Sequence, residues 1–317
     1  MTTAGSSAHA SPEGAVINLS LDEEYESLSL WQLALRRIRH DYLTLGAFTV
    51  LIILGILSLL APVISDALDV SYRRTNMENT FAPPGSPGHV LGTDDLGRDE
   101  LARLLYAGQV SLGIAFSAAA LSLLIGTTVG VIAGYNQGGR FGFIDDLLMW
   151  FVITLNSVPS LFLLLIIAAL LTPSVGTLIL ILALLSWTST MRFVRGETLS
   201  HREREYVVSA KAVGAKTPRI MFIHILPNVF SVLIVNLASD IGSLILVESS
   251  LSFLNLGVRP PTPSWGNMLT NAQTFFTKGV HLVWLPGILI VVTVLCLYLI
   301  GDGLRDAFDP QASKKVA

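Results

Sequence analysis

Long apolar runs without a charged residue dominate the pattern of this chain. Asp, Glu, Lys and Arg are missing from four runs: Tyr42–Ser65, Leu104–Gly139, Leu147–Met191 and Gly279–Gly301. A helix that crosses a membrane needs about 20 mostly apolar residues, so three of these runs accommodate one such helix each. The run that starts at Leu147 is 45 residues long and accommodates two, with residues 172–176 as the turn between them.

A sixth apolar segment, Asn228–Val247, is interrupted by Asp240. One central Asp opposes membrane insertion by about 2.5–3.5 kcal/mol, whereas each Leu, Ile, Val or Phe favours it by about 0.3–0.6 kcal/mol. Twelve residues of these four types lie between Asn228 and Glu248, and together they offset the aspartate. The pattern therefore predicts an all-α polytopic membrane protein with six transmembrane helices.

The distribution of basic residues predicts the orientation. With six spans both termini lie on one side, and 14 of the 20 Lys and Arg residues fall there. Basic residues concentrate in cytoplasmic loops, so we expect both termini in the cytoplasm. The expected order is a cytoplasmic N-terminal tail (1–42), a first transmembrane helix (43–65), an extracytoplasmic segment with an amphipathic helix (66–110), a five-helix core (111–302) with a cytoplasmic loop (195–227) and an extracytoplasmic loop (248–280), and a cytoplasmic C-terminal tail (303–317).

Composition narrows the function further. Only 14% of the residues are charged and 52% are hydrophobic, against about 25% charged residues in a soluble domain, which excludes a large soluble enzyme. The net charge of −3 offers no general attraction for nucleic acid. The sequence contains neither a phosphate-binding loop nor a His-Glu-x-x-His motif. We therefore expect a non-catalytic chain that binds no metal and no cofactor of its own.

Two polar segments on the expected outer side contain candidate docking or gating residues. Residues 93–99 are polar and interrupted by glycine, and the leucines that follow recur at helical spacing. This pattern fits a solvated loop before an interfacial helix, and it also fits a surface that docks a partner. In the second segment a tryptophan is suited to the membrane interface. The candidates are Gly92, Thr93, Asp94, Gly97, Arg98, Asp99, Arg259 and Trp265.

The cytoplasmic segment Arg195–Pro227 predicts two short helices. Ser200 and Glu203 have the spacing of a capping box, which would start a helix that runs to Val213. Gly214 then suits the left-handed position after the helix. Thr217 and Pro218 would start a second helix that ends before Pro227. The segment is either a structured loop or a docking element that moves with a cytoplasmic partner.

Inside the membrane the sequence offers a packing face and a candidate polar path. Gly126, Gly130 and Gly134 form two successive small-xxx-small repeats, which permit close approach of another helix. Pro159 is expected to break or kink the third span. The polar residues near that break and within the sixth segment, which are candidates for a polar path, are Asn156, Ser157 and Asp240. A contact between Asp240 and a partner helix explains that residue equally well.

Four motifs resemble one family. The stretch Glu205–Gly214, followed by Ile225–Asn228, resembles the EAA loop of ABC-importer permeases. Residues 89–106, 248–269 and 301–310 are similar to the C-type permease subunit of dipeptide and oligopeptide importers. The resemblance covers residues 33–310. In the loop, Val208, Ser209 and Ala210 stand where the family has Glu-Ala-Ala, and His224 replaces an isoleucine; Glu203 or Glu205 could supply the missing carboxylate.

The resemblance implies a type I ABC-importer permease fold in a prokaryotic plasma (inner) membrane. It implies a heterodimer with a second homologous permease, two cytoplasmic ATPase subunits that hold ATP and Mg, and an extracytoplasmic solute-binding protein. The residues it assigns to ATPase coupling are Glu203, Glu205, Tyr206, Val207, Val208, Ser209, Ala210, Lys211, Ala212, Val213, Gly214 and Pro227.

The function that the resemblance implies is a translocation path for di- and oligopeptides, operated by alternating access. Related permeases carry nickel chelates, glutathione, sugars or other small solutes, so these cargoes stay open as alternatives. A gradient-driven secondary transporter or channel that uses Asp240 is a further alternative from a different class of protein.

Overall fold

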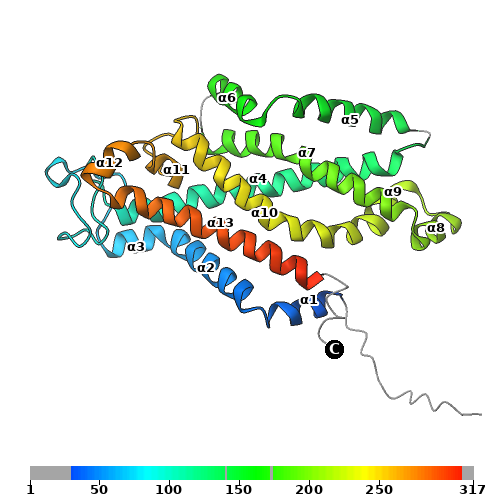
Figure 1. Ribbon diagram of the computed structural model, residues 1–317, viewed down its shortest axis with the longest axis horizontal. Helices are drawn as coiled ribbons and strands as arrows, with labels where there is room; N and C mark the ends of the chain where they lie inside the picture. The colour runs from blue at the N-terminus through cyan, green and yellow to red at the C-terminus, as the bar shows by residue number, and fades with distance from the viewer. Residues whose placement is uncertain (1–29, 140, 172–173, 309–317) are drawn as a thin grey trace, which may run out of the picture.

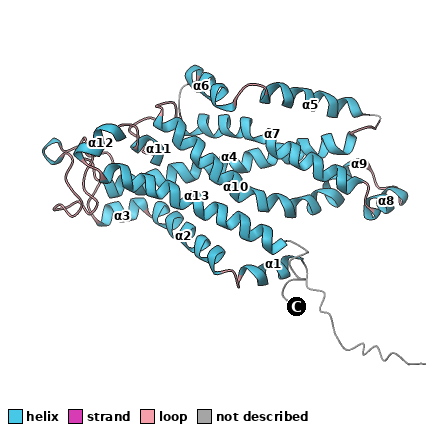
Figure 2. Ribbon diagram, in the orientation of Figure 1, coloured by secondary structure: helices cyan, strands magenta, loops and turns pink. Residues whose placement is uncertain are grey.

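The computed structural model describes residues 30–139, 141–171 and 174–308, and this part of the chain is mostly helical, with loops gathered mainly at one end (Figure 2). Most of the predicted N-terminal tail, part of the predicted turn at 172–176 and the last nine residues lie outside the described residues. The helices are α1 (Leu30–Ile38), α2 (Tyr42–Leu59), α3 (Ala61–Ala67), η1 (Met77–Asn79), α4 (Glu100–Asn136), α5 (Gly142–Asn156), α6 (Ser160–Leu170), α7 (Val175–Arg202), α8 (Glu205–Ala212), α9 (Thr217–Arg219), the π-helix η2 (Ile220–Ile225), α10 (Leu226–Phe253), α11 (Trp265–Met268), α12 (Ala272–Lys278) and α13 (His281–Phe308).

Five of these helices are long and apolar enough to cross a membrane: α2, α4, α7, α10 from Val232 onwards, and α13. The pair α5 and α6 makes a sixth crossing if it is counted as one span, although its two halves are bent by 83°. The bend lies at Pro159, where the sequence predicts a break, because proline cannot donate to the preceding helical turn. The prediction of an all-α polytopic membrane protein is confirmed.

The long helices run roughly along the longest axis of the molecule (Figure 1). The short helices α8 and α9 lie at one end, together with α1 and the last turns of α13. The loop after α3 and the helices α11 and α12 lie at the other end. The first and last described residues are therefore at the end that carries the predicted cytoplasmic loop. That this end faces the cytoplasm stays a prediction from the basic residues.

The element boundaries differ from the expected ones at three places. A separate interfacial helix before residue 110 was expected, but α4 is one continuous helix of 37 residues that begins at Glu100. It starts there because the Asp99 carboxylate accepts a hydrogen bond of 2.8 Å from the Ala102 N–H. Helix α13 continues to Phe308, into the expected C-terminal tail, and α1 lies within the expected N-terminal tail.

The closest packing in the bundle is between α4 and α7, and it depends on the three glycines of the small-xxx-small repeats. A Cβ atom on Gly126 would lie 2.8 Å from the Trp187 carbonyl oxygen. A Cβ atom on Gly130 would lie 2.7 Å from the Met191 carbonyl oxygen, one turn further along α7. A Cβ atom on Gly134 would lie 2.7 Å from the Arg195 carbonyl oxygen, one turn further again. Side chains at these positions would separate the two backbones, so the glycines set the distance between the helices.

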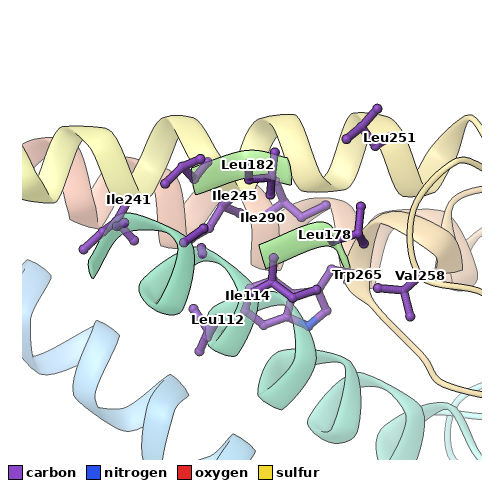
Figure 3. Close-up of a cluster of buried hydrophobic side chains, with 14 of the residues drawn as sticks. Leu112, Ile114, Leu178, Leu182, Ile241, Ile245, Leu251, Val258, Trp265 and Ile290 are labelled. Carbon is purple, nitrogen blue, oxygen red and sulfur yellow. The ribbon is translucent and has the colours of Figure 1, made fainter. Parts of the chain in front are cut away.

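The main apolar core lies between α4, α7, α10 and α13 (Figure 3). Ile114 of α4 and Leu178 of α7 are fully buried there, together with Ile245 of α10. The indole of Trp265, from α11, closes the core at one end. The core therefore joins α4, α7 and α10, three of the helices that line the site described below, to α13.

Replacing Gly130 with alanine tests the role of the glycines. The added methyl group would lie 2.7 Å from both the Met191 carbonyl oxygen and the Val194 Cβ atom, so we expect Gly130→Ala to destabilise the protein by about 1–3 kcal/mol. Gly113 is the matched control, because it lies in the same helix with no atom within 4 Å of an added Cβ. Gly113→Ala should leave stability unchanged or raise it by up to about 1 kcal/mol. Thermal unfolding of the purified protein in detergent measures both, and equal effects would contradict the packing account.

Candidate functional site

A polar cavity of about 360 Å³ lies between the helices, where α4, α6, α7 and α10 meet beside the end of α5. The described residues that line it carry hydroxyl groups, one amide and one carboxylate beside apolar side chains, and none of them is Lys, Arg or His. The polar residues of the lining are Ser122, Asn156, Ser160, Ser186, Thr188, Ser189, Thr190, Asp240 and Ser243. A cavity of this size and polarity suits a small polar solute.

Two of the three residues predicted for a polar path meet in this cavity. Asn156 reaches it from the end of α5, and Asp240 reaches it from the middle of α10. Ser157 is exposed at the break, where its hydroxyl donates to the Ile153 carbonyl oxygen at 2.8 Å. Non-helical backbone is tolerated within a membrane where it lines a cavity or is buried in protein. The break before Ser160 therefore forms part of the cavity wall, with Asn156 and Ser160 on either side of it.

At the end of the molecule that carries α8 and α9, α8 is anchored to the bundle by one buried face. Val207 is fully buried in a cluster that includes Val131 of α4, Val194 of α7 and Ile220 of η2. Val208 and Val213 point elsewhere, with 52% and 89% of their surface exposed. The helix thus has one face that holds it to the bundle, while apolar side chains stay available to another molecule.

Polar contacts also tie the segment around α8 to the ends of α4 and α7. The Tyr206 hydroxyl lies 2.9 Å from Nδ1 of His201, which is buried near the end of α7. Burial raises the pKa of the Tyr206 hydroxyl. The Arg202 guanidinium donates to the carbonyl oxygens of Tyr135 and Gln137, at 3.2 and 2.6 Å. The first contact joins α8 to α7, and the Arg202 contacts join the end of α7 to the end of α4.

The structure corrects the predicted details of this segment. The helix expected to start at a capping box on Ser200 does not start there: Ser200 lies inside α7, which continues to Arg202, and α8 begins at Glu205. Gly214 has a φ angle of +86°, so the predicted left-handed corner is confirmed. The expectation that Pro227 ends the second helix was wrong. The chain stays helical from α9 through η2 into α10, because the π-helical turn before Pro227 accommodates a residue without an N–H.

The residues predicted for coupling surround one surface groove of about 570 Å³. Its lining contains Tyr206, Ser209, Ala210, Val213 and Gly214, together with Ala215, Arg219 and His224. The other predicted coupling residues with exposed side chains are Glu203, Glu205, Val208, Lys211, Ala212 and Pro227. With the exception of the buried Val207, the set is therefore accessible at this end of the molecule.

The opposite end is a cap held together by buried ionic groups. The Asp94 carboxylate is 2% exposed and accepts hydrogen bonds from the backbone N–H groups of Leu96 and Arg98, both at 2.9 Å. It also pairs with the guanidinium groups of Arg98 and Arg103. Burial lowers the pKa of Arg98, whose side chain remains paired with Asp94. Asp94 thus organises the turn that precedes α4.

The remaining candidates in the first outer segment also serve the folding of the cap. The Thr93 hydroxyl donates to the Asn79 carbonyl oxygen, and the Asp99 carboxylate bonds His89 at 2.8 Å. Gly92 and Gly97 have φ angles of +83° and +69°. All four candidates are buried. If a protein docks here, these buried residues contribute by holding the cap in shape, because they cannot contact the docked protein directly.

Trp265 was expected at the membrane interface, and this expectation was wrong. The side chain is only 1% exposed, and its indole N–H donates to the Leu104 carbonyl oxygen at 3.2 Å. The Trp265 backbone N–H donates to the Ser111 hydroxyl, which donates to the buried Glu248 carboxylate, both at 3.1 Å. Trp265 therefore links the cap to α4 and α10. Arg259 is exposed and is the candidate that a docked protein would contact directly.

An ion pair that the sequence analysis missed joins the broken span to the bundle. The Arg195 guanidinium of α7 donates two hydrogen bonds to the buried Asp145 carboxylate of α5, at 2.5 and 2.7 Å. Residues of opposite charge close to the two ends of the charge-free run Leu147–Met191 were a signal for this contact. The pair fixes the start of α5 against α7.

Comparison with known proteins identifies the family. Residues 126–314 match the family described as binding-protein-dependent transport system inner membrane component, and residues 29–84 match the N-terminal TM domain of oligopeptide transport permease C. The chain belongs to this family of inner membrane components, and it is a multi-pass protein of the bacterial inner membrane.

Individual relatives align with most of the chain. The dipeptide transport system permease protein DppC of Alkalihalophilus pseudofirmus is 36% identical over 92% of this chain and 93% of its own length. The oligopeptide transport system permease protein OppC of Bacillus subtilis is 35% identical over 91% of this chain and 92% of its own. The di/tripeptide transport system permease protein DppC of Pseudomonas aeruginosa is 39% identical over 72% and 74%.

A double-mutant cycle tests the ion pair between α5 and α7. Arg195→Met leaves the buried Asp145 carboxylate without its cation, which typically destabilises a protein by about 3–5 kcal/mol. Adding Asp145→Asn removes the stranded charge, so the double variant should recover part of the loss. Thermal unfolding of the purified protein measures the loss of stability in Arg195→Met, in Asp145→Asn and in the double variant. Additive effects of the two substitutions would show that the pair does not fix α5.

Proposed function

We propose that this chain is a permease subunit of an ATP-driven importer and that it forms part of the translocation path for di- and oligopeptides. The observation that carries the proposal is a continuous connection between two surfaces: α4 and α7 line the polar cavity, and the same two helices anchor α8. The dipeptide, oligopeptide and di/tripeptide transport systems named for the relatives support peptide as the cargo.

The surface around α8 is the proposed docking site for the cytoplasmic ATPase subunits, of which the complete importer would contain two. Its groove and the exposed Val208 and Val213 side chains offer an apolar contact that docking would bury. ATP and Mg would bind in those subunits, and this chain would itself be non-catalytic and without a cofactor. A second, homologous permease would complete the path, and an extracytoplasmic solute-binding protein would dock on the cap near Arg259.

The proposed mechanism is alternating access. Closure of the ATPase dimer on ATP would move α8, and the buried Val207 would pass this movement to Val131 of α4 and Val194 of α7. Because α4 and α7 line the cavity, their tilt would turn it from inward-open to outward-open. The binding protein would then deliver its cargo, and hydrolysis would reset the complex.

Reconstitution tests this function against the alternatives. The complete complex in proteoliposomes should take up a dipeptide only when the binding protein and ATP are both supplied. The chain alone under a proton gradient should take up nothing, and uptake by it would favour a gradient-driven transporter that uses Asp240. If the complete complex takes up nickel chelates, glutathione or sugars instead of peptides, the chain is still a permease of an ATP-driven importer, but its cargo is not peptide.

Gly214 offers a test of the docking surface. Its φ angle of +86° excludes β-branched residues, although no atom lies within 4 Å of an added Cβ. Gly214→Val should therefore distort the corner after α8 and abolish co-purification of the ATPase subunits. Gly214→Asn is the matched control, because asparagine tolerates the left-handed conformation, and it should retain most of the bound ATPase. Normal co-purification with the valine variant would contradict the docking site.

A further inference from the structure

Asp240 occupies an unusual position among the acidic residues of the bundle. It lies halfway along α10, and its side chain lines the polar cavity together with Asn156 and several hydroxyl groups. None of the residues that the structure describes in the cavity lining is basic. A carboxylate at such a depth needs a positively charged partner or a polar surrounding, since the membrane interior stabilises a lone charge poorly.

Asp240 differs from two other bundle carboxylates in having no partner among the described residues. Asp145 is paired with Arg195, and Glu248 accepts hydrogen bonds from Ser111 and Ser252, at 3.1 and 2.7 Å. The Asp240 carboxylate forms no ion pair and no hydrogen bond with any residue that the structure describes. Asp145 and Glu248 are thus satisfied within the chain, whereas Asp240 is an exposed residue of the cavity lining whose acceptor oxygens have no donor among the described residues.

The surroundings of Asp240 fit an ammonium group. An ammonium has three N–H donors and no acceptor, so it needs one negative charge and further oxygen acceptors. The cavity supplies the charge from Asp240 and hydroxyl oxygens from Ser186 and Ser189 of α7. The side-chain N–H of Asn156 is already donated to the Val152 carbonyl oxygen at 2.8 Å, which leaves the amide oxygen of Asn156 as an acceptor.

We propose that Asp240 is the anionic centre of a subsite for a primary ammonium group of the cargo, such as the N-terminal ammonium of a peptide. The subsite rests on the proposed function, because the cargo must enter this cavity. It adds a chemical selection to that function: within the membrane the path would favour a solute with a free ammonium over an isosteric solute that lacks one.

Direct binding tests the subsite without the contribution of the solute-binding protein. The assembled transporter in nanodiscs is titrated with alanyl-alanine and with its des-amino analogue propionyl-alanine, and binding is followed by ligand-observed saturation-transfer NMR. Wild type should bind alanyl-alanine at least roughly tenfold more tightly, which corresponds to about 1.4 kcal/mol. Asp240→Asn should bind both compounds with equal, weak affinity.

Two further variants separate charge from polarity and shape. Asp240→Glu keeps the charge and should keep the preference for alanyl-alanine. Ser189→Ala removes one hydroxyl of the same cavity, whose side chain is exposed there, and should keep most of the preference. Equal binding of both compounds by wild type would overturn the subsite, and so would a full preference in Asp240→Asn.

Assembly and uptake measured on the same preparations distinguish the remaining outcomes. If Asp240→Asn no longer co-purifies the second permease, the partner of Asp240 is a cation of that subunit and the subsite is overturned. If wild-type proteoliposomes take up no peptide although the ammonium preference is present, the proposed function fails and the subsite stands.

Discussion

The close approach of α4 and α7 is the contact on which the rest of the structure depends. Lipid chains are as apolar as leucine, so two helices in a membrane gain little from hydrophobic burial and associate through tight packing. Gly126, Gly130 and Gly134 leave a bare strip on α4 against which the α7 backbone lies. Both helices then line the cavity at one level and hold α8 at another. If α4 and α7 were packed less tightly, a movement of α8 would not be transmitted to the cavity.

The two ends of the molecule are built on different physical principles. The cap is fixed by polar groups such as the buried Asp94 and Glu248 and the partly buried Arg103, which are expensive to separate from their partners. The end around α8 is fixed by aliphatic packing at Val207 and leaves Val213 exposed. A rigid cap at one end and an α8 with exposed apolar side chains at the other fit the proposed subunit. It would receive cargo at the cap, and the ATPase subunits would move α8.

Local features of the fold could be predicted from the sequence. Runs without charge indicate the spans, Pro159 indicates the break, and Gly214 indicates a left-handed corner, because each depends on a few neighbouring residues. The spacing of Gly126, Gly130 and Gly134 indicated a packing face, although not the identity of the helix packed against it. Helix ends were harder: Ser200 has a capping sequence, but α7 continues past it to Arg202, whose guanidinium donates to carbonyl oxygens at the end of α4.

The site itself required the arrangement of the helices. Nothing local shows that Asn156 and Asp240 line one cavity, that Asp145 pairs with Arg195, or that Trp265 is enclosed by α4. These contacts join residues far apart in the sequence. Single residues can be assigned a chemistry from sequence, whereas a cavity is a property of several helices together.

The central claim is that α8 moves as one body with the helices that line the cavity. Spin labels at Lys216, which is exposed after the Gly214 corner, and at Leu124 of α4, which is also exposed, allow double electron–electron resonance to measure this in the complete transporter, with Cys296 replaced by serine. Between the nucleotide-free and the vanadate-trapped state, the account predicts an unchanged distance between these labels and a changed distance from Leu124 to the second permease. A changed distance between Lys216 and Leu124, with an unchanged distance from Leu124 to the second permease, would contradict it.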